Sequence, residues 1–524
     1  MSCLNLPLSI RNDHAFVYIP GLYRCKDGRE PNAKNAETRH FLKPLVDEFL
    51  DGYTRGVRPY GTYESQKAQE PPYSRSFKVA ISNASMDAKS AKPANGLLDV
   101  TSHIFCHVCK CWHAVHLGRT DCEQWVRADD NYLREGAQKW HNAECSEDRK
   151  FIEDCFGTRT SELWRLPYWQ PSRQVVSEPM HTAYLNVVQR YCREVLGLDN
   201  PNDRRKVDKT PKYTRSCRAL TPEERQRQLT ELSKSMNQRS AYRVGDIHRF
   251  LSQPLDDDRL SQGHLRSSLD DASIDALMYV CVDLGRLPVG NFSKTHLIHE
   301  LITWRLAMPR TPLQPIKIDS SGLLRRLQQA VKEVITPAWI SKPPADVGTS
   351  AAGTLKADHW RRLIEIYLPL AMLSLWIEES PSAARNASLM LPALETSMHL
   401  TCAAILMAKL SLTIKRREQF RDHLIQHMEG IKQHFGGFIF PTHHLSLHMF
   451  DFMEEFSGVR HWWSMPFESL GGKLQRIRTN HKPGEQQSTI HHSFCKSSVY
   501  RQWLLRPDCP PLLQYCLKLL DKAY

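Results

Sequence analysis

The sequence has no uninterrupted run of about eighteen apolar residues, so we expect no membrane-spanning helix. Its N-terminus lacks a basic leader before the short apolar stretch that follows Met1, which argues against a secretory signal. Internal repeats and long low-complexity tracts are also missing. We therefore expect an intracellular globular protein with no membrane partner, whose 15 cysteines stay reduced or bind metal.

Length and charge narrow the class of protein further. A chain of 524 residues can form two or three domains. Its net charge of +13 and its pI near 9.0 suit a polyanionic partner such as nucleic acid, because Lys and Arg release counterions from phosphates. Many basic proteins bind no nucleic acid, so charge alone leaves the partner open.

The N-terminal part alternates strand-like and helical patterns. These patterns predict strands at 15–19 and 77–81, a further short strand at 174–177, and a helix from about 181 to 196. Asp87 lies in the loop after the second strand, where α/β folds commonly place a metal-binding acid.

The chain is predicted to be mainly helical from there to about residue 435. Residues 203–215 are polar and basic without apolar periodicity, which favours a solvated linker over a DNA-contacting arm. Two short helices are expected within 268–306. The strongest helical patterns lie at 323–335, 360–376 and 398–435.

Cys106 and Cys109 have the Cys-x-x-Cys spacing that lets two thiolates bind one tetrahedral zinc ion. Taken alone, the pair fits two free buried cysteines equally well. Cys111 and His113 follow closely and could complete a local metal site. The sequence therefore leaves a local and a long-range ligand set open.

Three histidines, His443, His444 and His448, lie within six residues of what looks like a helix. Residues at i and i+4 share a helix face, so His444 and His448 can present their imidazoles to one metal ion. His443 points elsewhere on a regular helix and is the weaker candidate, although the choice between His443 and His444 stays open. Structural or exposed histidines are the alternative.

Two further segments contain acids. Glu468 ends the segment His461-Trp-Trp-Ser-Met-Pro-Phe-Glu468, where an exposed glutamate is the default interpretation. Glu178 and His181 form a Glu-x-x-His pair just before the predicted helix. Nothing in either pattern alone makes these residues catalytic.

As an ordered set from residue 1 to about 485, these motifs resemble those of CACTA (En/Spm)-type DNA transposases, particularly the fungal kind. The segments that carry the resemblance are 3–11 with 43–49, Asp87 with Gly96, Phe105–Cys109, 163–171 with Glu178–His181, His443–His448, and Trp462–Glu468 with 475–482. Each motif is weak alone, and the family follows from their order.

The resemblance implies an α/β plus α fold, in which an RNase H-like core is interrupted by a large all-helical insertion. It implies a partial core at 1–200, a linker and helical insertion at 201–435, a return to the core at 436–490 and a C-terminal tail at 491–524. Cys106, Cys109, His444 and His448 would together bind one structural zinc, which would tie the ends of the insertion together and position Glu468.

The chemistry of such a family is DNA strand cleavage and joining by carboxylates that hold two Mg²⁺ ions. Asp87 and Glu468 would be two of the three acids. The first acid of the family lies upstream of the segment matched by residues 1–20, and Glu178 stands where the family usually has Asp. The resemblance therefore predicts a nuclear protein that binds double-stranded DNA, with homo-oligomers possible and an incomplete Mg²⁺ site that leaves it catalytically inactive. The alternative is a non-catalytic, zinc-stabilised DNA- or protein-binding remnant.

Overall fold

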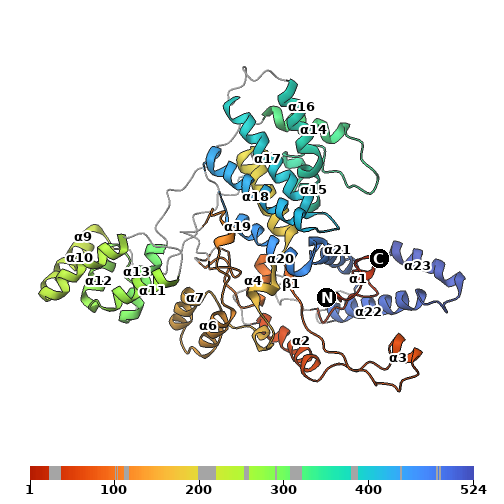
Figure 1. The fold of residues 1–524 in the computed structure, drawn as a ribbon, viewed down its shortest axis with the longest axis horizontal. Coiled ribbons are helices and arrows are strands. Elements are labelled where there is room, and N and C mark those ends of the chain that lie inside the picture. The colour runs from red at the N-terminus through yellow and green to blue at the C-terminus, as the bar shows by residue number, and fades with distance from the viewer. Residues whose placement is uncertain are drawn as a thin grey trace.

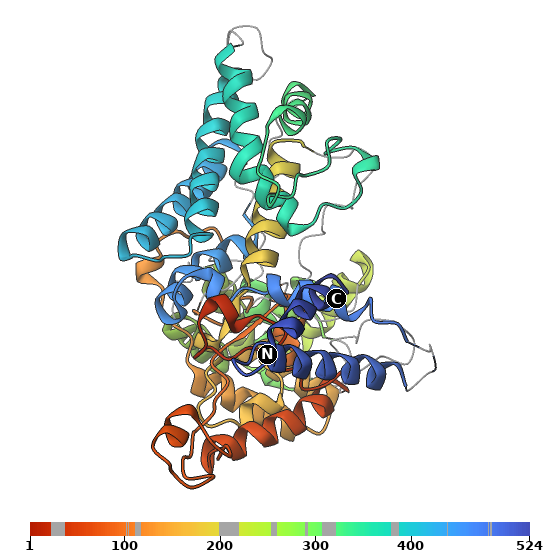
Figure 2. The same ribbon diagram turned by 90° about the vertical axis from the view of Figure 1, so that its right-hand side faces the viewer.

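The structure, a computed structural model, describes residues 1–22, 37–100, 102, 104–110, 117–198, 220–252, 259–288, 292–306, 321–378, 387–436, 439–479, 482 and 485–523. Most of these residues are helical, and among them one sheet of two short strands is found (Figures 1 and 2). The α/β part of the expected fold is therefore much smaller than predicted. An RNase H-like core remains a prediction.

The N-terminal part contains both strands and a series of short helices. Its elements are α1 (Leu8–Arg11), α2 (Glu37–Thr54), α3 (Tyr63–Lys67), β1 (Ala84–Met86), α4 (Ala88–Ala94), η1 (Cys122–Gln124), α6 (Asp130–Asn142), α7 (Ser146–Phe156), η2 (Glu162–Arg165), α8 (Pro171–Gln174), β2 (Val175–Ser177), η3 (Met180–Val188) and η4 (Tyr191–Val195).

The sheet joins two segments that are about ninety residues apart in the sequence. Strands β1 and β2 are parallel, and Met86 lies opposite Ser177 in their register. Asp87 and Glu178 directly follow the two strands, so both acids stand at the same edge of the sheet. The strand predicted at 174–177 is confirmed.

Two predicted strands are wrong. Residue Val17 forms one isolated bridge, to Ser2, and Phe77 forms one, to Val57. The backbone of Ile81 instead donates to the hydroxyl of Tyr168. A strand needs a continuous partner for its N–H and C=O groups, and neither segment has one among the described residues.

The helix predicted at 181–196 is present as η3 and η4, two wide π-helical segments joined through Gln189 and Arg190. The side chains of Tyr184 and Tyr191 in these segments are almost completely buried in the largest hydrophobic core. This helix therefore runs through the interior and carries the chain from the sheet edge into the helical part.

A group of helices from residues 321–434 packs around the buried helix formed by η3 and η4. It consists of α14 (Ser321–Glu333), η5 (Ser350–Ala352), α15 (Ala357–Arg362), η6 (Leu363–Tyr367), α16 (Leu368–Glu378), α17 (Ala387–Met407) and α18 (Ile414–His434). The predicted continuous helix at 398–435 is wrong, because the chain leaves helical geometry at 409–413 and α17 and α18 pack against each other.

One segment of α17, Leu389–Met407, is long and apolar enough to cross a membrane, with a mean hydropathy of 1.4. Its side chains at Ala393, Leu400 and Met407 belong to the largest core. Core helices share this composition, so the segment carries little weight as a membrane span.

Five helices form a separate group within the predicted insertion, and the last four of them share a hydrophobic cluster. They are α9 (Pro222–Ser235), α10 (Gln238–Ser252), α11 (Arg259–Asp270), α12 (Ile274–Asp283) and α13 (Lys294–Leu306). The core residues of this group, from Ile247 to Leu301, contact one another and not the main core, and Figure 1 shows the group standing apart. The helix pair expected within 268–306 is confirmed by α12 and α13, and the predicted linker at 203–215 lies outside the described residues.

The C-terminal part returns to the N-terminal part. Its helices are α19 (Pro441–Leu447), α20 (Met449–Phe456), η8 (Val459–His461), α21 (Met465–Leu474), α22 (Gln486–Leu504) and α23 (Pro511–Ala523). The side chains of Ser498 and Gln502 on α22 donate to the carbonyls of His14 and Ala15. These bonds tie the backbone at His14 and Ala15 to α22.

Candidate metal centre and neighbouring acidic site

The Cys-x-x-Cys segment is held as a rigid turn. The backbone amide of Ala128 donates to the carbonyl of Val108, and the amide of Lys110 donates to the carbonyl of Val126. The amide of Val108 points to the sulfur of Cys106 at 3.4 Å. These contacts aim both thiols at one point in the interior.

The histidines reach the same point from the other end of the chain. His444 lies in α19, and His448 follows that helix directly while keeping a helical backbone conformation. The two Nε2 atoms are therefore only 3.1 Å apart. The structure thus selects His444 over His443, since His443 turns its Nδ1 back to accept from the amide of Phe440.

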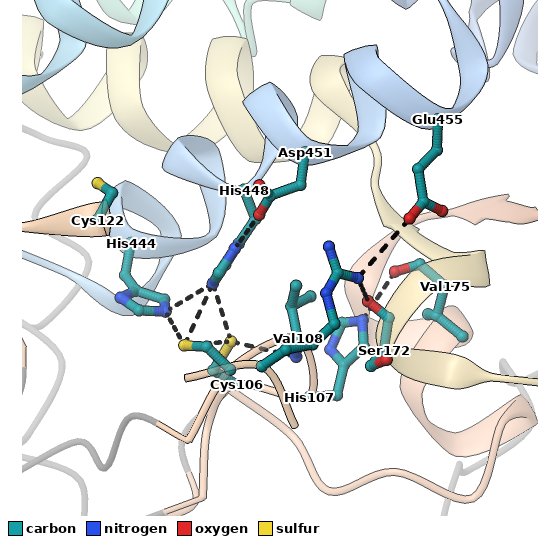
Figure 3. Close-up of polar contacts among 12 residues, drawn as sticks. Cys106, His107, Val108, Cys122, Ser172, Val175, His444, His448, Asp451 and Glu455 are labelled. Atoms are coloured by element: carbon teal, nitrogen blue, oxygen red, sulfur yellow. Dashed lines mark hydrogen bonds and ion pairs between the residues drawn. The ribbon is translucent and has the colours of Figure 1, made fainter. Parts of the chain in front are cut away.

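We call Cys106, Cys109, His444 and His448 the Cys2His2 cluster. Its two sulfurs are 3.6 Å apart, and the sulfur-to-nitrogen distances are 3.2, 3.3 and 3.4 Å (Figure 3). A tetrahedral zinc site, with bonds of about 2.3 Å to sulfur and 2.0–2.1 Å to nitrogen, has ligand-to-ligand distances of about 3.3–3.8 Å. The cluster is slightly tighter than this and could hold a metal ion such as zinc.

The surroundings of the cluster suit a closed structural metal site. All four side chains are buried. Asp451, three residues after His448, accepts from Nδ1 of that histidine at 2.8 Å and so directs its Nε2 towards the cluster. The indole of Trp125 stacks on His444, with ring centroids 4.3 Å apart.

Sequence reasoning missed both of these contacts. The i,i+3 spacing of His448 and Asp451 on one helix could have revealed the first, whereas nothing in the sequence pointed to Trp125.

The ionisation of the cluster reflects its crowding. Burial lowers the pKa of His448, but the charges of Cys106 and Asp451 and their hydrogen bonds outweigh it and raise the pKa to about 10. Burial raises the pKa of Cys106, but the Cys109 thiol and both histidines outweigh it and lower the pKa well below its usual value. Metal binding needs deprotonated thiols and neutral imidazoles, so it must release protons here.

Among the described residues beside the cluster, one further cysteine, Cys122, does not join it. Cys122 belongs to the same pocket, but burial raises the pKa of its thiol to about 12, and its sulfur donates to the carbonyl of Thr120. The alternative ligands Cys111 and His113 lie outside the described residues, so the local site proposed for them stays untested.

Glu178 occupies a closed pocket at the end of β2. It is 1% exposed, and one of its oxygens accepts from the amides of Met180 and Ser464. The other oxygen accepts from the amide and from Nδ1 of His181, both at 2.8 Å. Burial raises the pKa of Glu178, but these donors outweigh it and lower the pKa. Sequence reasoning could not have found the bond from Ser464, because a backbone amide donates it.

We call Asp87, Glu178, His181 and Glu468 the acidic site. Nε2 of His181 lies 4.0 Å from a carboxylate oxygen of Glu468, which is 58% exposed in the first turn of α21. Burial lowers the pKa of His181, but the bond to Glu178 and the charges of Glu178, Asp87 and Glu468 outweigh it and raise the pKa. Three acids from separate segments of the sequence therefore all act on His181.

The cluster and the acidic site are physically connected. His107, inside the Cys-x-x-Cys turn, is bonded through Nε2 to the carbonyl of Val175 at 2.7 Å (Figure 3). Burial lowers the pKa of His107 to about 4, so the ring is neutral and Nε2 carries the donated proton. The turn that carries the two thiols is thus bonded to β2, the strand that ends at Glu178.

No family model, no curated protein and no solved structure matches the chain. The functional argument therefore rests on the residues and their geometry.

Proposed function

We propose that the protein is a transposase-derived DNA-binding protein of the CACTA type, with a zinc-stabilised core and an acidic site that does not cut DNA. The observation that carries the proposal is the convergence of Asp87, Glu178 and Glu468 around His181. Two of these acids end adjacent parallel strands, and the third enters on a helix from the C-terminal part. Acids at the carboxyl ends of parallel strands are a usual arrangement for metal-assisted chemistry on phosphates.

Zinc is the metal that suits the Cys2His2 cluster best, because two thiolates and two imidazoles in a closed tetrahedral set are typical of structural zinc. The bound ion would balance the charge of both thiolates. It would also join the turn at Cys106 to α19, two segments more than three hundred residues apart. An RNase H-like core interrupted by a helical insertion would need such a link at the two ends of the insertion.

The acidic site is a poor fit to two Mg²⁺ ions. Both oxygens of Glu178 already accept two hydrogen bonds each from the protein, so this carboxylate has little capacity left for a metal ion. Among the acids of the site, Asp87 and Glu468 remain available. Two-metal cleavage needs carboxylates that clamp both ions, so we expect no strand cleavage.

DNA binding without cleavage is the activity that we expect. The net charge of +13 favours a polyanion, and the family resemblance makes double-stranded DNA in the nucleus the natural partner. The enclosed Glu178 favours this non-catalytic interpretation over an active transposase. A protein-binding remnant is the competing outcome.

The test combines binding and cleavage on DNA that carries terminal inverted repeats. We expect binding that weakens steeply as salt rises, and no nicking in Mg²⁺ or Mn²⁺. The controls are Asp87→Ala and Glu468→Ala, which should leave binding within about twofold, since acids do not attract phosphates.

Two results would contradict the proposal. Nicking that disappears in Asp87→Ala or Glu468→Ala would show that the site is catalytic. Absence of DNA binding even at low salt would favour the protein-binding alternative.

A further inference from the structure

Three arginines from two distant parts of the chain lie around one glutamate. Arg361 and Arg362 end α15, Glu365 lies in η6, and Arg460 lies in η8. Nε of Arg361 donates to one carboxylate oxygen of Glu365 at 2.8 Å, and Nη1 of Arg362 lies 3.8 Å from the other oxygen. We call Arg361, Arg362 and Arg460 the arginine cluster.

Arg460 joins the other two arginines through a shared aromatic neighbour. The guanidinium groups of Arg361 and Arg460 both lie over the indole of Trp463, at 5.8 and 5.5 Å from the ring centroid. Burial lowers the pKa of Arg460, and the charges of Arg361 and Arg362 lower it further, while that of Glu365 raises it. The three positive charges are therefore close enough to act on one another.

The cluster has more donors and more positive charge than its neighbours balance. Glu365 acts on all three arginines, and Asp358 lies 3.6 Å from Arg362. Three guanidinium groups and these two carboxylates add up to one positive charge. Nε of Arg362 and Nε of Arg460 are buried, and neither has a hydrogen-bond partner within the part of the chain that the structure describes. The cluster can therefore donate further hydrogen bonds to an anion.

A buried hydroxyl lies beside the cluster. Tyr184 of η3 is 1% exposed, and its hydroxyl has no hydrogen-bond partner among the described residues. Burial raises the pKa of Tyr184, and the charges that act on its hydroxyl include those of Glu365 and of the whole arginine cluster. Buried hydroxyls normally have a partner, so this one is a further donor for an anion held by the arginines.

The cluster is only partly enclosed. Arg361 is 8% exposed and the side chain of Arg362 is 16% exposed, whereas Arg460 and Trp463 are half-buried. A ligand can therefore reach guanidinium groups that have already lost much of their water. Charge-assisted hydrogen bonds are stronger in such surroundings than in bulk solvent.

We propose that the arginine cluster binds one phosphate group. A guanidinium group is planar, stays charged at physiological pH, and presents paired N–H donors that match two phosphate oxygens. Arginines from two segments can surround a tetrahedral anion, whereas a carboxylate ligand offers one planar pair of oxygens and would satisfy fewer donors. Free phosphate and the backbone of DNA present the same oxygens, so either can be the source of the group.

Calorimetric titration of the full-length protein with inorganic phosphate, at constant ionic strength, tests the proposal. We expect one saturable site per chain with a dissociation constant of about 0.1–1 mM, and no saturable binding of chloride. Arg460→Gln should weaken phosphate binding by at least about 10-fold, because it removes a charged pair of donors. The matched control is Arg149→Gln, since Arg149 is also half-buried and lies 5.0 Å from the ring centroid of Trp140; it should leave phosphate binding unchanged.

A second variant tests the sign of the charge. Glu365→Gln removes a negative charge beside the arginines without changing the size of the side chain, so phosphate should bind at least about threefold more tightly. Thermal unfolding shows whether each variant is folded at the temperature of the titration. Three results would overturn the proposal: no saturable phosphate binding by the native protein, equal binding by Arg460→Gln, or weaker binding by a folded Glu365→Gln.

A DNA duplex distinguishes the two sources of phosphate. If the cluster holds a backbone phosphate, inorganic phosphate should compete with the duplex, and Arg460→Gln should weaken DNA binding by about 10-fold. If it holds free phosphate, Arg460→Gln should bind the duplex within about twofold of the native protein and still lose inorganic phosphate. The titration with inorganic phosphate contains no DNA, so its failure would leave the proposed DNA binding untouched.

Discussion

The Cys2His2 cluster and the acidic site are assembled in the same way but closed to different degrees. Each joins a segment near the sheet to a helix from the C-terminal part. All four side chains of the cluster are buried, whereas Glu468 in the acidic site is 58% exposed. A closed site leaves no position for a substrate and stabilises the fold, while an open site can meet a ligand. The protein thus has a buried Cys2His2 cluster next to an acidic site that is partly open to solvent.

The largest effect is expected at the closed centre. Cys106→Ser or His448→Ala should reduce the zinc content from one ion per chain to nearly none and lower Tm by more than about 10 °C, because metal binding contributes directly to folding. Elemental analysis and thermal unfolding would measure both.

Cys3→Ser is the control for this change, because Cys3 is exposed and far from the cluster in sequence. Two zinc ions per chain, or zinc loss on Cys111→Ser or His113→Ala, would show that the ligands lie elsewhere.

The next effect concerns the enclosed member of the acidic site. Glu178→Ala should lower the free energy of unfolding by about 3 kcal/mol, because it leaves buried backbone donors and the ring of His181 without their acceptor. The exposed Glu468→Ala should change it by less than about 0.5 kcal/mol. Urea unfolding of both variants compares them, and equal losses would contradict the division of the site into closed and open parts.

A smaller effect is expected from the residue that orients His448. Asp451→Asn should weaken zinc binding about 10- to 100-fold, since a carboxylate partner fixes the ring and raises its basicity. Competition with a chelator measures the affinity. Asp422→Asn, an exposed change on α18, serves as the control. Unaltered zinc affinity in Asp451→Asn would show that Asp451 does not orient His448 for the metal.

The smallest effect should appear in the pH dependence of stability. The pKa of His181 is raised above its ordinary 6.5 and that of Glu178 is lowered below its ordinary 4.5. Both groups therefore contribute their full stabilisation of the fold between pH 4.5 and 6.5. The contribution of His181 is lost as pH rises through its raised pKa. The contribution of Glu178 is lost as pH falls through its lowered pKa.

The stability difference between the native protein and His181→Gln should thus shrink by less than about 1 kcal/mol on going from pH 6 to alkaline pH. The exposed His492→Gln is the control. A difference that grows with rising pH would reverse the assigned sign.

The local parts of the candidate site were predictable from sequence because they depend on chain geometry over a few residues. Cys106 and Cys109 meet because three residues make one tight turn, and His444 and His448 meet because four residues make about one helical turn. The pairing of these two halves into one cluster came only from the family resemblance. The acidic residues were named in the same way, while the bond from Ser464 to Glu178 was not foreseen.

The fold was less predictable than the site. Alternating apolar residues at 15–19 and 77–81 satisfied the strand pattern, yet each segment found only one bridging residue. The apolar pattern at 398–435 gave no sign of the break at 409–413 or of the packing between α17 and α18. Periodicity indicates which side chains can be buried together, but it does not indicate which other segment will pair with a predicted strand.

By itself, the sequence of this protein determined which residues could bind a metal and how they are spaced within each short segment. The tertiary structure decided that His444 and not His443 joins the two cysteines, because α19 turns one ring towards the Cys-x-x-Cys turn and the other back to its own backbone. It also decided that Glu178 is enclosed while Glu468 is open. Burial and long-range contact depend on how distant segments pack, and no local pattern contains that information.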